Sequence, residues 1–138
     1  MRLTVTLIAL IALMGHGSVA SPASLSPAAS PATIEVEMNE FRFRPAVIRL
    51  QVGRPASLRL VNRGQLAHQI QTEAFRRLPM TIVDEQSYVE APGVEVLRLQ
   101  PGGAATLRFT PRVRGRVRFA CTIEGHQEAG MAGVIEVR

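Results

Sequence analysis

The sequence predicts an all-β domain built as a sandwich or a barrel. Three features of the 138-residue chain support this prediction. Apolar and polar residues alternate with a period of two along many short segments, which is typical of strands with one buried face. Turns containing glycine and proline separate these segments. Few stretches show the period of about 3.6 residues that an amphipathic helix requires.

The first half of the chain contains four predicted strands. Ile34, Val36 and Met38 alternate with two glutamates, so this segment is expected to bury one face. The other three are residues 47–52, which end before Gly53, residues 57–62, and the short segment 68–71.

The second half contains four more predicted strands. They are residues 94–99, 105–109, 117–121 and 134–137. Residues 73–93 show no clear period. Residues 75–78 are compatible with one helical turn, which Pro79 would end. Residues 91–93, Ala-Pro-Gly, indicate a tight turn of the chain. We therefore expect an excursion of undefined shape between two strands.

The N-terminal segment is predicted to be a secretory signal peptide. Arg2 precedes an apolar run, residues 3–13, and Ser18-Val19-Ala20 has the small-x-small form of a cleavage site. The run is shorter than the ~18 residues expected of a membrane span, which makes a retained anchor the less favoured alternative. Residues 21–32 contain only Ser, Pro, Ala and Leu and indicate a linker.

The predicted organisation is therefore a signal peptide at residues 1–20, a linker at 21–32 and one folded domain at 33–138. We expect a secreted or periplasmic protein, with no stable insertion into a membrane and a monomeric state.

All sixteen basic side chains are arginines, and the formal net charge is +5. Loss of Arg2 with the signal peptide would leave +4. A modest positive charge favours an acidic partner. Nucleic acid is not expected, because the arginines at 112, 114, 116 and 118 alternate as a solvated strand face would, and an exported protein rarely meets DNA.

The single cysteine is the most informative residue. An exported chain with one cysteine cannot form an internal disulfide, so the thiol is a buried bystander, an intermolecular linker or a ligand. Cys121, His126 and Met131 lie within eleven residues of one another, and His68 starts a predicted strand far upstream. Two imidazoles, one thiolate and a weak axial thioether are the ligands of a blue-copper electron-transfer centre. Zinc sites more often use several cysteines.

Each of these residues also has a simpler interpretation when it is taken alone. Cys121 could be a core thiol, since cysteine is often fully buried, and Met131 could fill the core. A Cys–His nucleophile pair is a further alternative, but no Asn or Asp on this loop could orient the histidine. The order and spacing of all four residues favour the metal site.

The pattern Asn62…His68 followed by Cys121-x4-His126-x4-Met131 resembles the cupredoxins. Phe43-Arg44-Pro45 and Val52-Gly53 resemble the early strands of that family, and the ligand spacing is closer to rusticyanin and auracyanin than to plastocyanin. The resemblance covers roughly residues 34–137. It departs at Gln69, because many members carry Asn directly after the first histidine.

The resemblance implies a Greek-key β-sandwich of about eight strands that holds one type 1 copper ion. His68, Cys121 and His126 would be the strong equatorial ligands, and Met131 the long axial one. His126 would lie near the surface as the electron port, ringed by apolar side chains such as Leu66, Ala67, Ala129 and Met131.

The expected function is an exported carrier of single electrons between redox proteins, such as a cytochrome or an oxidase component. Copper handling in metal tolerance is the alternative. An enzyme is not expected. The chain has three histidines, of which His16 would leave with the signal peptide, so none remains for a second, catalytic copper.

Overall fold

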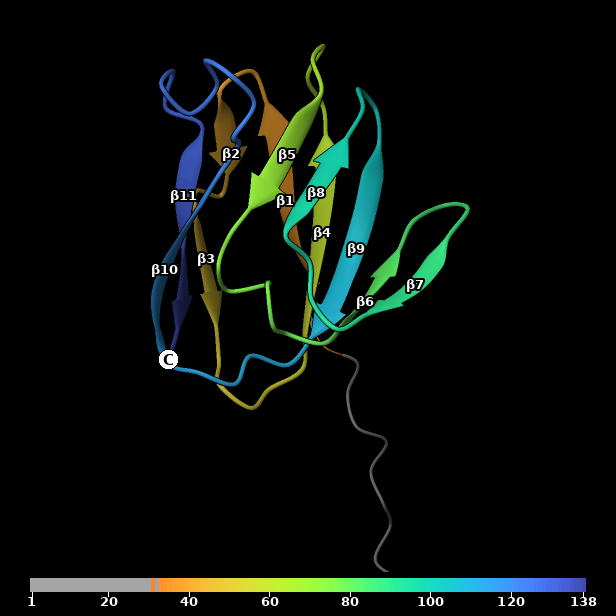
Figure 1. The fold of residues 1–138 in the computed structure, drawn as a ribbon, viewed down its shortest axis with the longest axis vertical. Coiled ribbons are helices and arrows are strands. Elements are labelled where there is room, and N and C mark those ends of the chain that lie inside the picture. The colour runs from red at the N-terminus through yellow and green to blue at the C-terminus, as the bar shows by residue number, and fades with distance from the viewer. Residues whose placement is uncertain (1–30, 32) are drawn as a thin grey trace, which may run out of the picture.

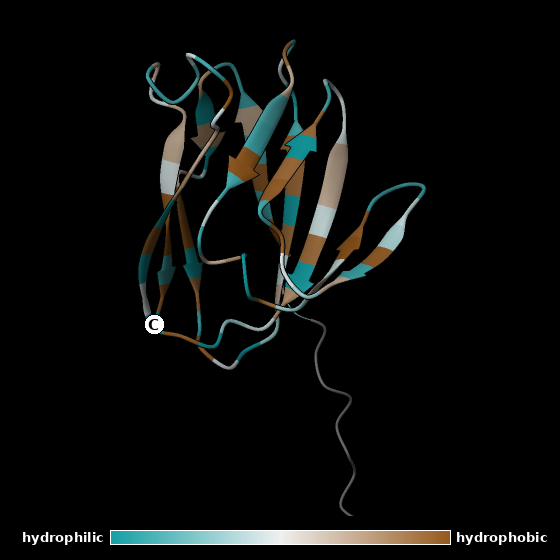
Figure 2. Ribbon diagram, in the orientation of Figure 1, coloured by the Kyte–Doolittle hydropathy of each residue, from teal (hydrophilic) through white to brown (hydrophobic). Residues whose placement is uncertain are grey.

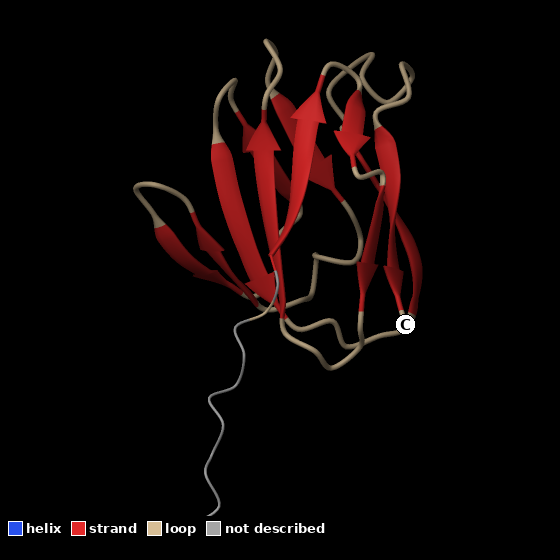
Figure 3. Ribbon diagram, turned by 180° about the vertical axis from the view of Figure 1, so that it is seen from behind, coloured by secondary structure: helices blue, strands red, loops and turns tan. Residues whose placement is uncertain are grey.

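The computed structural model describes residue 31 and residues 33–138. The predicted signal peptide and all but one residue of the predicted linker lie outside this part of the chain. The described residues form eleven strands in two facing sheets, and strands and loops are the only elements that Figures 1 and 3 show. Among the described residues there is no helix that is long and apolar enough to cross a membrane.

The first sheet has six strands in the order β2-β1-β4-β9-β6-β7. Its members are β1 (Thr33–Asn39), β2 (Arg42–Arg44), β4 (Ala56–Asn62), β6 (Met80–Val83), β7 (Tyr88–Ala91) and β9 (Ala104–Phe109). β1 runs parallel to β4, and the other neighbours in this sheet are antiparallel.

The second sheet has five strands in the order β3-β11-β10-β5-β8. Its members are β3 (Val47–Leu50), β5 (His68–Gln71), β8 (Val96–Leu99), β10 (Gly115–Ala120) and β11 (Ala132–Val137). β3 runs parallel to β11, and the other pairs are antiparallel. The chain crosses repeatedly between the two sheets, which confirms the predicted all-β Greek-key sandwich and excludes the simple barrel.

The structure describes eleven strands, where the resemblance implied about eight. Part of the difference lies in β2, which has only three residues, and part in the β6–β7 hairpin inside residues 73–93. The hairpin lies at the edge of its sheet, with Tyr88 and Val89 exposed, so it carries little of the alternation that marks a half-buried strand. The helical turn considered for residues 75–78 is instead part of a run of tight turns, in which Leu78 N–H donates to the carbonyl of Phe75 at 3.3 Å.

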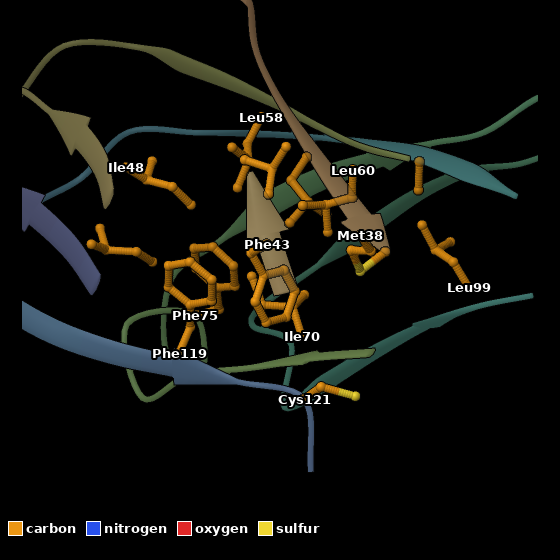
Figure 4. Packing of buried hydrophobic residues seen from close by; sticks show 14 of the residues in the cluster. Met38, Phe43, Ile48, Leu58, Leu60, Ile70, Phe75, Leu99, Phe119 and Cys121 are labelled. Carbon is orange, nitrogen blue, oxygen red and sulfur yellow. The ribbon is translucent and has the colours of Figure 1, made fainter. Parts of the chain in front are cut away.

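A single hydrophobic core lies between the sheets. Hydropathy alternates along several strands in Figure 2, as expected when one face packs inward. Figure 4 shows part of the buried cluster, with Cys121 at its edge. The fully buried members of this cluster include Val36, Met38, Ile48, Leu58, Leu60, Leu107, Cys121 and Met131. The core therefore reaches from the middle of the sandwich to the segment that carries the predicted ligands.

The loops that surround this segment gather at one end of the sandwich. The β1–β2 turn, the loop before β5, and the loop of residues 121–131 between β10 and β11 all lie at the top of Figure 1. Residues that are far apart in sequence therefore meet at this end.

Candidate metal centre

Three of the four predicted ligands lie at the ends of strands, and the fourth lies in the loop between β10 and β11. His68 is the first residue of β5, Cys121 directly follows β10, His126 lies in the loop, and Met131 directly precedes β11. His68, Cys121 and Met131 are fully buried, and the side chain of His126 is only slightly exposed. Strand ends are held by ladder hydrogen bonds, so the first and last ligands have rigid anchors.

Three of the four side chains converge. The ligand atoms of His68, Cys121 and His126 all lie within 4.8 Å of one another. The Nδ1 atoms of the two histidines are 3.3 Å apart, and Cys121 Sγ lies 3.4 Å from His126 Nδ1. Met131 is buried in the same hydrophobic cluster as Cys121, and its assignment as the axial ligand stays a prediction.

The ligand loop is closed by its own backbone. Cys121 N–H donates to the carbonyl of Met131 at 3.0 Å, and Met131 N–H donates to the carbonyl of His126 at 3.0 Å. Gly125 and Gly130, each directly before a predicted ligand, have φ of 78° and 100°. Other residues rarely adopt these conformations, so glycine permits the tight path that returns the chain to Met131.

A buried asparagine shapes the loop that precedes His68. Asn62 is fully buried, and its Nδ2 donates to the carbonyls of Leu66 at 2.8 Å and Leu99 at 3.0 Å. Its Oδ1 accepts from Gly64 N–H at 3.0 Å. These three bonds fix both sides of the loop, which sets the position at which His68 enters β5.

Gln69 links the two segments that carry the predicted ligands His68 and Cys121. Its Nε2 donates to Thr122 Oγ1 at 2.6 Å, and its Oε1 accepts from Arg98 Nε at 2.9 Å. Thr122 directly follows Cys121 and also donates to Gln71 Oε1 at 2.8 Å. The residue after the first histidine, a Gln where many cupredoxins have Asn, thus bridges to Thr122, the residue next to Cys121.

The β1–β2 turn also contacts the site, and sequence reasoning missed it. Glu40 Oε1 lies 3.9 Å from His68 Nε2, and the ring of Phe41 packs edge-on against that of His126 with centroids 5.1 Å apart. Neither residue carries a sequence signal, because each contact joins segments that are distant in the chain.

Burial lowers the pKa of His68, and the neighbouring His126 lowers it further, while Glu40 raises it by a smaller amount. The imidazole therefore remains neutral to a lower pH than usual. A neutral imidazole is the form that can bind a metal ion, so this environment is compatible with the predicted ligand role of His68.

The donor set fits a metal ion. Two nitrogen ligands about 2 Å from one ion lie a little over 3 Å apart, which is the spacing of the two Nδ1 atoms here. A single proton on His126 Nδ1 could serve only one of its two neighbours, the sulfur or the other nitrogen. A cation would satisfy all three atoms. Two imidazoles and one sulfur donor suit copper better than the harder divalent ions.

The surface around His126 is partly apolar. Leu66 and Phe41 have exposed fractions of 46% and 39%, and Ala129 is exposed on the ligand loop. Met131 is fully buried, so the expectation that it contributes to an apolar surface ring is wrong. Its side chain is part of the core, because the loop turns inward before β11.

The fold and the donor set define a class: a β-sandwich protein with a candidate metal site at one end. A family model for the cupredoxin-like domain matches residues 4–135. The chain therefore belongs to the cupredoxin-like family.

Two curated relatives are similar over most of this chain. The copper-resistant cuproprotein CopI of Pseudomonas aeruginosa is 25% identical over 174 aligned positions, covering 99% of this chain and 96% of that protein. A protein of the same name from Rubrivivax gelatinosus is 30% identical over 112 positions, covering 77% of this chain and 66% of its own length.

Solved structures show the same fold. A dithionite-reduced auracyanin from Roseiflexus castenholzii has a TM-score of 0.56 and 20% identity, covering 79% of this chain and 99% of its own. A multi-copper oxidase from Pseudomonas thermotolerans has a TM-score of 0.63 and 18% identity, covering 81% of this chain but 32% of its own. The chain thus spans about a third of that oxidase.

Proposed function

We propose that the chain is an exported copper protein that holds one type 1 copper ion and passes single electrons between redox partners. The observation that carries this proposal is the convergence of His68, Cys121 and His126 in a buried cluster, beside a loop that its own backbone hydrogen bonds close. A site that is already assembled needs little rearrangement when its ion changes charge, and this favours fast electron exchange.

The ligands have distinct roles in this proposal. Copper, when bound, supplies one-electron chemistry between its two-plus and one-plus states. Cys121 contributes a thiolate, the two histidines complete an equatorial set, and Met131 tunes the potential from the axial side. Burial of all four side chains excludes water from the ligand sphere.

Electron transfer without catalysis is supported by the histidine count. The predicted domain, residues 33–138, contains two histidines, His68 and His126, and the type 1 site would use both. An oxidase or nitrite reductase needs a further copper with its own imidazole ligands, and this chain has no histidine left in the domain for one. The likeness to multicopper oxidases supports a shared fold only.

Copper tolerance is the second candidate, and a specific observation favours it. Both curated relatives bear the name copper-resistant cuproprotein, and one aligns with nearly the whole chain. The same four ligands could hold copper for storage or delivery. Against this stands the small supply of further soft donors, since the domain has only Met38, Met80 and Met131, of which Met38 and Met131 are fully buried and Met80 nearly so.

Copper binding is tested by the visible spectrum of the copper(II)-loaded protein. We expect one copper per chain and an intense thiolate-to-copper charge-transfer band. Cys121→Ser should abolish the band, while the control Glu128→Gln, an exposed change on the same loop, should keep it. A Cys121→Ser protein that retains the band would refute the assigned ligand.

The two candidate functions are separated by how the reduced protein handles its metal. A carrier should keep copper(I) against a moderate chelator for hours and show fast electron self-exchange by NMR line broadening. A copper-delivery protein should lose copper(I) quickly and exchange electrons slowly. The second pattern would move the assignment to copper tolerance.

The partner and the location follow from the same proposal. An acidic redox protein is the expected partner, because the domain carries excess arginine. The predicted signal peptide supports a secreted or periplasmic location, which cell fractionation of the full-length protein would test.

A further inference from the structure

The β1–β2 turn reaches both histidines of the candidate site. It consists of Glu40 and Phe41, between Asn39 at the end of β1 and Arg42 at the start of β2. Figure 1 places this turn at the same end of the sandwich as the ligand loop. Two adjacent residues of one turn thus contact two histidines that are 58 positions apart in the chain.

The first contact concerns a buried nitrogen without a partner. His68 is fully buried, its Nδ1 faces His126, and its Nε2 forms no hydrogen bond. An imidazole that binds a metal through Nδ1 carries its proton on Nε2. A buried N–H without an acceptor is unfavourable, so metal binding creates a need for an acceptor at this position.

Glu40 is placed to meet that need. Its Oε1 lies 3.9 Å from His68 Nε2 and accepts hydrogen bonds from the backbone N–H groups of Gln65 and, at 3.3 Å, Leu66. The carboxylate is therefore held by the loop that leads into β5. A small shift of the imidazole or the carboxylate would bring the two atoms into hydrogen-bond range.

Gly64 keeps the space between these groups open. A Cβ atom at this position would lie 2.5 Å from Glu40 Oε1 and 2.9 Å from His68 Nε2. Both separations are shorter than real Cβ contacts, so any other residue would require the carboxylate or the imidazole to move from its position. The glycine is explained by the approach of Glu40 to His68.

The second contact involves a strained backbone. Phe41 has a φ of 59°, which is uncommon for a bulky side chain. Its ring is partly exposed rather than part of the core, and its aromatic contact is with His126, at an interplanar angle of 80°. An unfavourable conformation persists when the surrounding structure requires it, and such residues cluster at functional sites.

We propose that the Glu40–Phe41 turn is a positioning element of the copper site, an inference that rests on the proposed function. Glu40 accepts the Nε2 proton of His68 and fixes that imidazole with Nδ1 toward the metal. Phe41 covers the ring of His126 and slows exchange of the metal with solvent. The negative charge of Glu40 also favours copper(II) over copper(I).

The first test uses the metal-free protein. Nitrogen-15 shifts of His68 report which ring nitrogen carries the proton. The wild type should hold the Nε2–H tautomer, and Glu40→Gln should shift the population toward a mixture of tautomers. The control Glu128→Gln removes the same charge from an exposed residue at the same end of the sandwich and should leave the tautomer unchanged. An unchanged tautomer in Glu40→Gln would overturn the role of Glu40.

The second test compares copper affinities. Glu40→Gln should shift the ratio of copper(I) to copper(II) affinity toward copper(I) by roughly tenfold, because a nearby negative charge is lost. Glu128→Gln should shift it several-fold less. Equal shifts of the affinity ratio in the two variants would show that Glu40 acts only as a distant surface charge, which would overturn the proposal.

The third test separates the ring of Phe41 from its backbone. Phe41→Gly relieves the strained φ, so the metal-free protein should be at least as stable as the wild type. The same variant should release copper(I) to a chelator at least several-fold faster. Phe41→Asn, which also tolerates this conformation, should repeat the result if the glycine variant folds poorly. Unchanged release from either folded variant would show that the ring does not cover the site.

These outcomes are distinct from failure of the proposed function. A wild-type protein without a charge-transfer band would refute the type 1 copper site itself. A wild type that has the band, with Glu40 and Phe41 variants that match it in tautomer, affinity ratio and release rate, would refute only the positioning role.

Discussion

Cys121 and Met131, the two sulfur-containing residues of the candidate site, are joined by their backbones: Cys121 N–H donates to the carbonyl of Met131 at 3.0 Å. The bond closes an eleven-residue loop at the point where β10 ends and β11 begins. Because it uses no side-chain atom, replacing either side chain should leave the loop closed. This property allows the ligand roles to be tested separately from the fold.

The axial position is the first such test. Met131→Leu conserves volume and should cost less than about 1.5 kcal/mol of unfolding free energy, whereas Met131→Ala opens a cavity and should cost about 2–5 kcal/mol. With copper bound, Met131→Leu should raise the reduction potential, because it removes a donor. Met131→Gln should lower the potential, because an oxygen donor favours copper(II). Cyclic voltammetry measures both shifts, and equal potentials in all three proteins would mean that Met131 is only part of the core.

Asn62 should be required for the shape of the loop before His68. Asn62→Ala would leave two carbonyls and one N–H without their hydrogen bonds. Each of these groups that stays buried and unpaired should lower the free energy of unfolding by about 1–3 kcal/mol. Urea denaturation of the metal-free protein should show this loss. Copper affinity should fall as well, since His68 would lose its fixed approach, while the colour that Cys121 produces should persist. A copper affinity equal to that of the wild type would show that the shape of the loop before His68 does not affect metal binding.

The bridge between Gln69 and Thr122 should be energetically coupled. A double-mutant cycle with Gln69→Ala and Thr122→Val should give an interaction energy of about 0.5–3 kcal/mol, as expected for residues in one hydrogen-bond network. Gln71→Ala is the matched control, because Gln71 also bonds to Thr122 but is less buried. The interaction energy between Gln71 and Thr122 should be smaller than that between Gln69 and Thr122. Additive effects for Gln69 and Thr122 would mean that the two ligand segments are joined elsewhere.

Much of this site could be predicted because its signal is local. Cys121, His126 and Met131 lie on one short segment, and alternation along residues 117–121 indicates that the cysteine points inward, where the structure places it. The same alternation predicted most of the strands. Burial with a period of two is recorded in the sequence wherever one face of a strand packs against the core.

The remaining features depend on contacts between distant segments. Glu40 contacts His68 and Phe41 contacts His126 only because the end of β1, the start of β5 and the loop of residues 121–131 lie together, and no local sequence pattern encodes these contacts. The β6–β7 hairpin escaped prediction for a different reason. As an edge element with exposed apolar residues, it lacks the contrast between a buried and a solvated face.

Close packing at Gly133 should prevent this position from accepting any side chain. A Cβ atom there would overlap the ring of Phe119 and the carbonyl oxygen of Ala46. Gly133→Ala should therefore destabilise the protein by about 1–3 kcal/mol through overpacking. Adding Phe119→Leu should recover only part of the loss, because the backbone carbonyl of Ala46 remains. Full recovery, or no initial loss in thermal unfolding, would contradict the packing seen here.

The last prediction concerns the redox partner and separates charge from contact. Excess arginine should attract an acidic partner, so raising the salt concentration should slow association as the Debye length falls from about 10 Å at 0.1 M to about 3 Å at 1 M. Ala129, exposed on the ligand loop, lies in the apolar surface near His126 through which the electron is expected to pass.

Ala129→Glu should lower the electron-transfer rate at every salt concentration, because a bulky charge prevents close approach. Stopped-flow mixing with an acidic cytochrome measures both effects, and Glu85→Ala, at the tip of the β6–β7 hairpin, is the control for a remote surface change. An association rate that increases with salt would reject the acidic partner. The exposed glutamates at 124 and 128, beside the site, would then explain the repulsion of an acidic partner. An Ala129→Glu protein with wild-type kinetics would place the electron port away from His126.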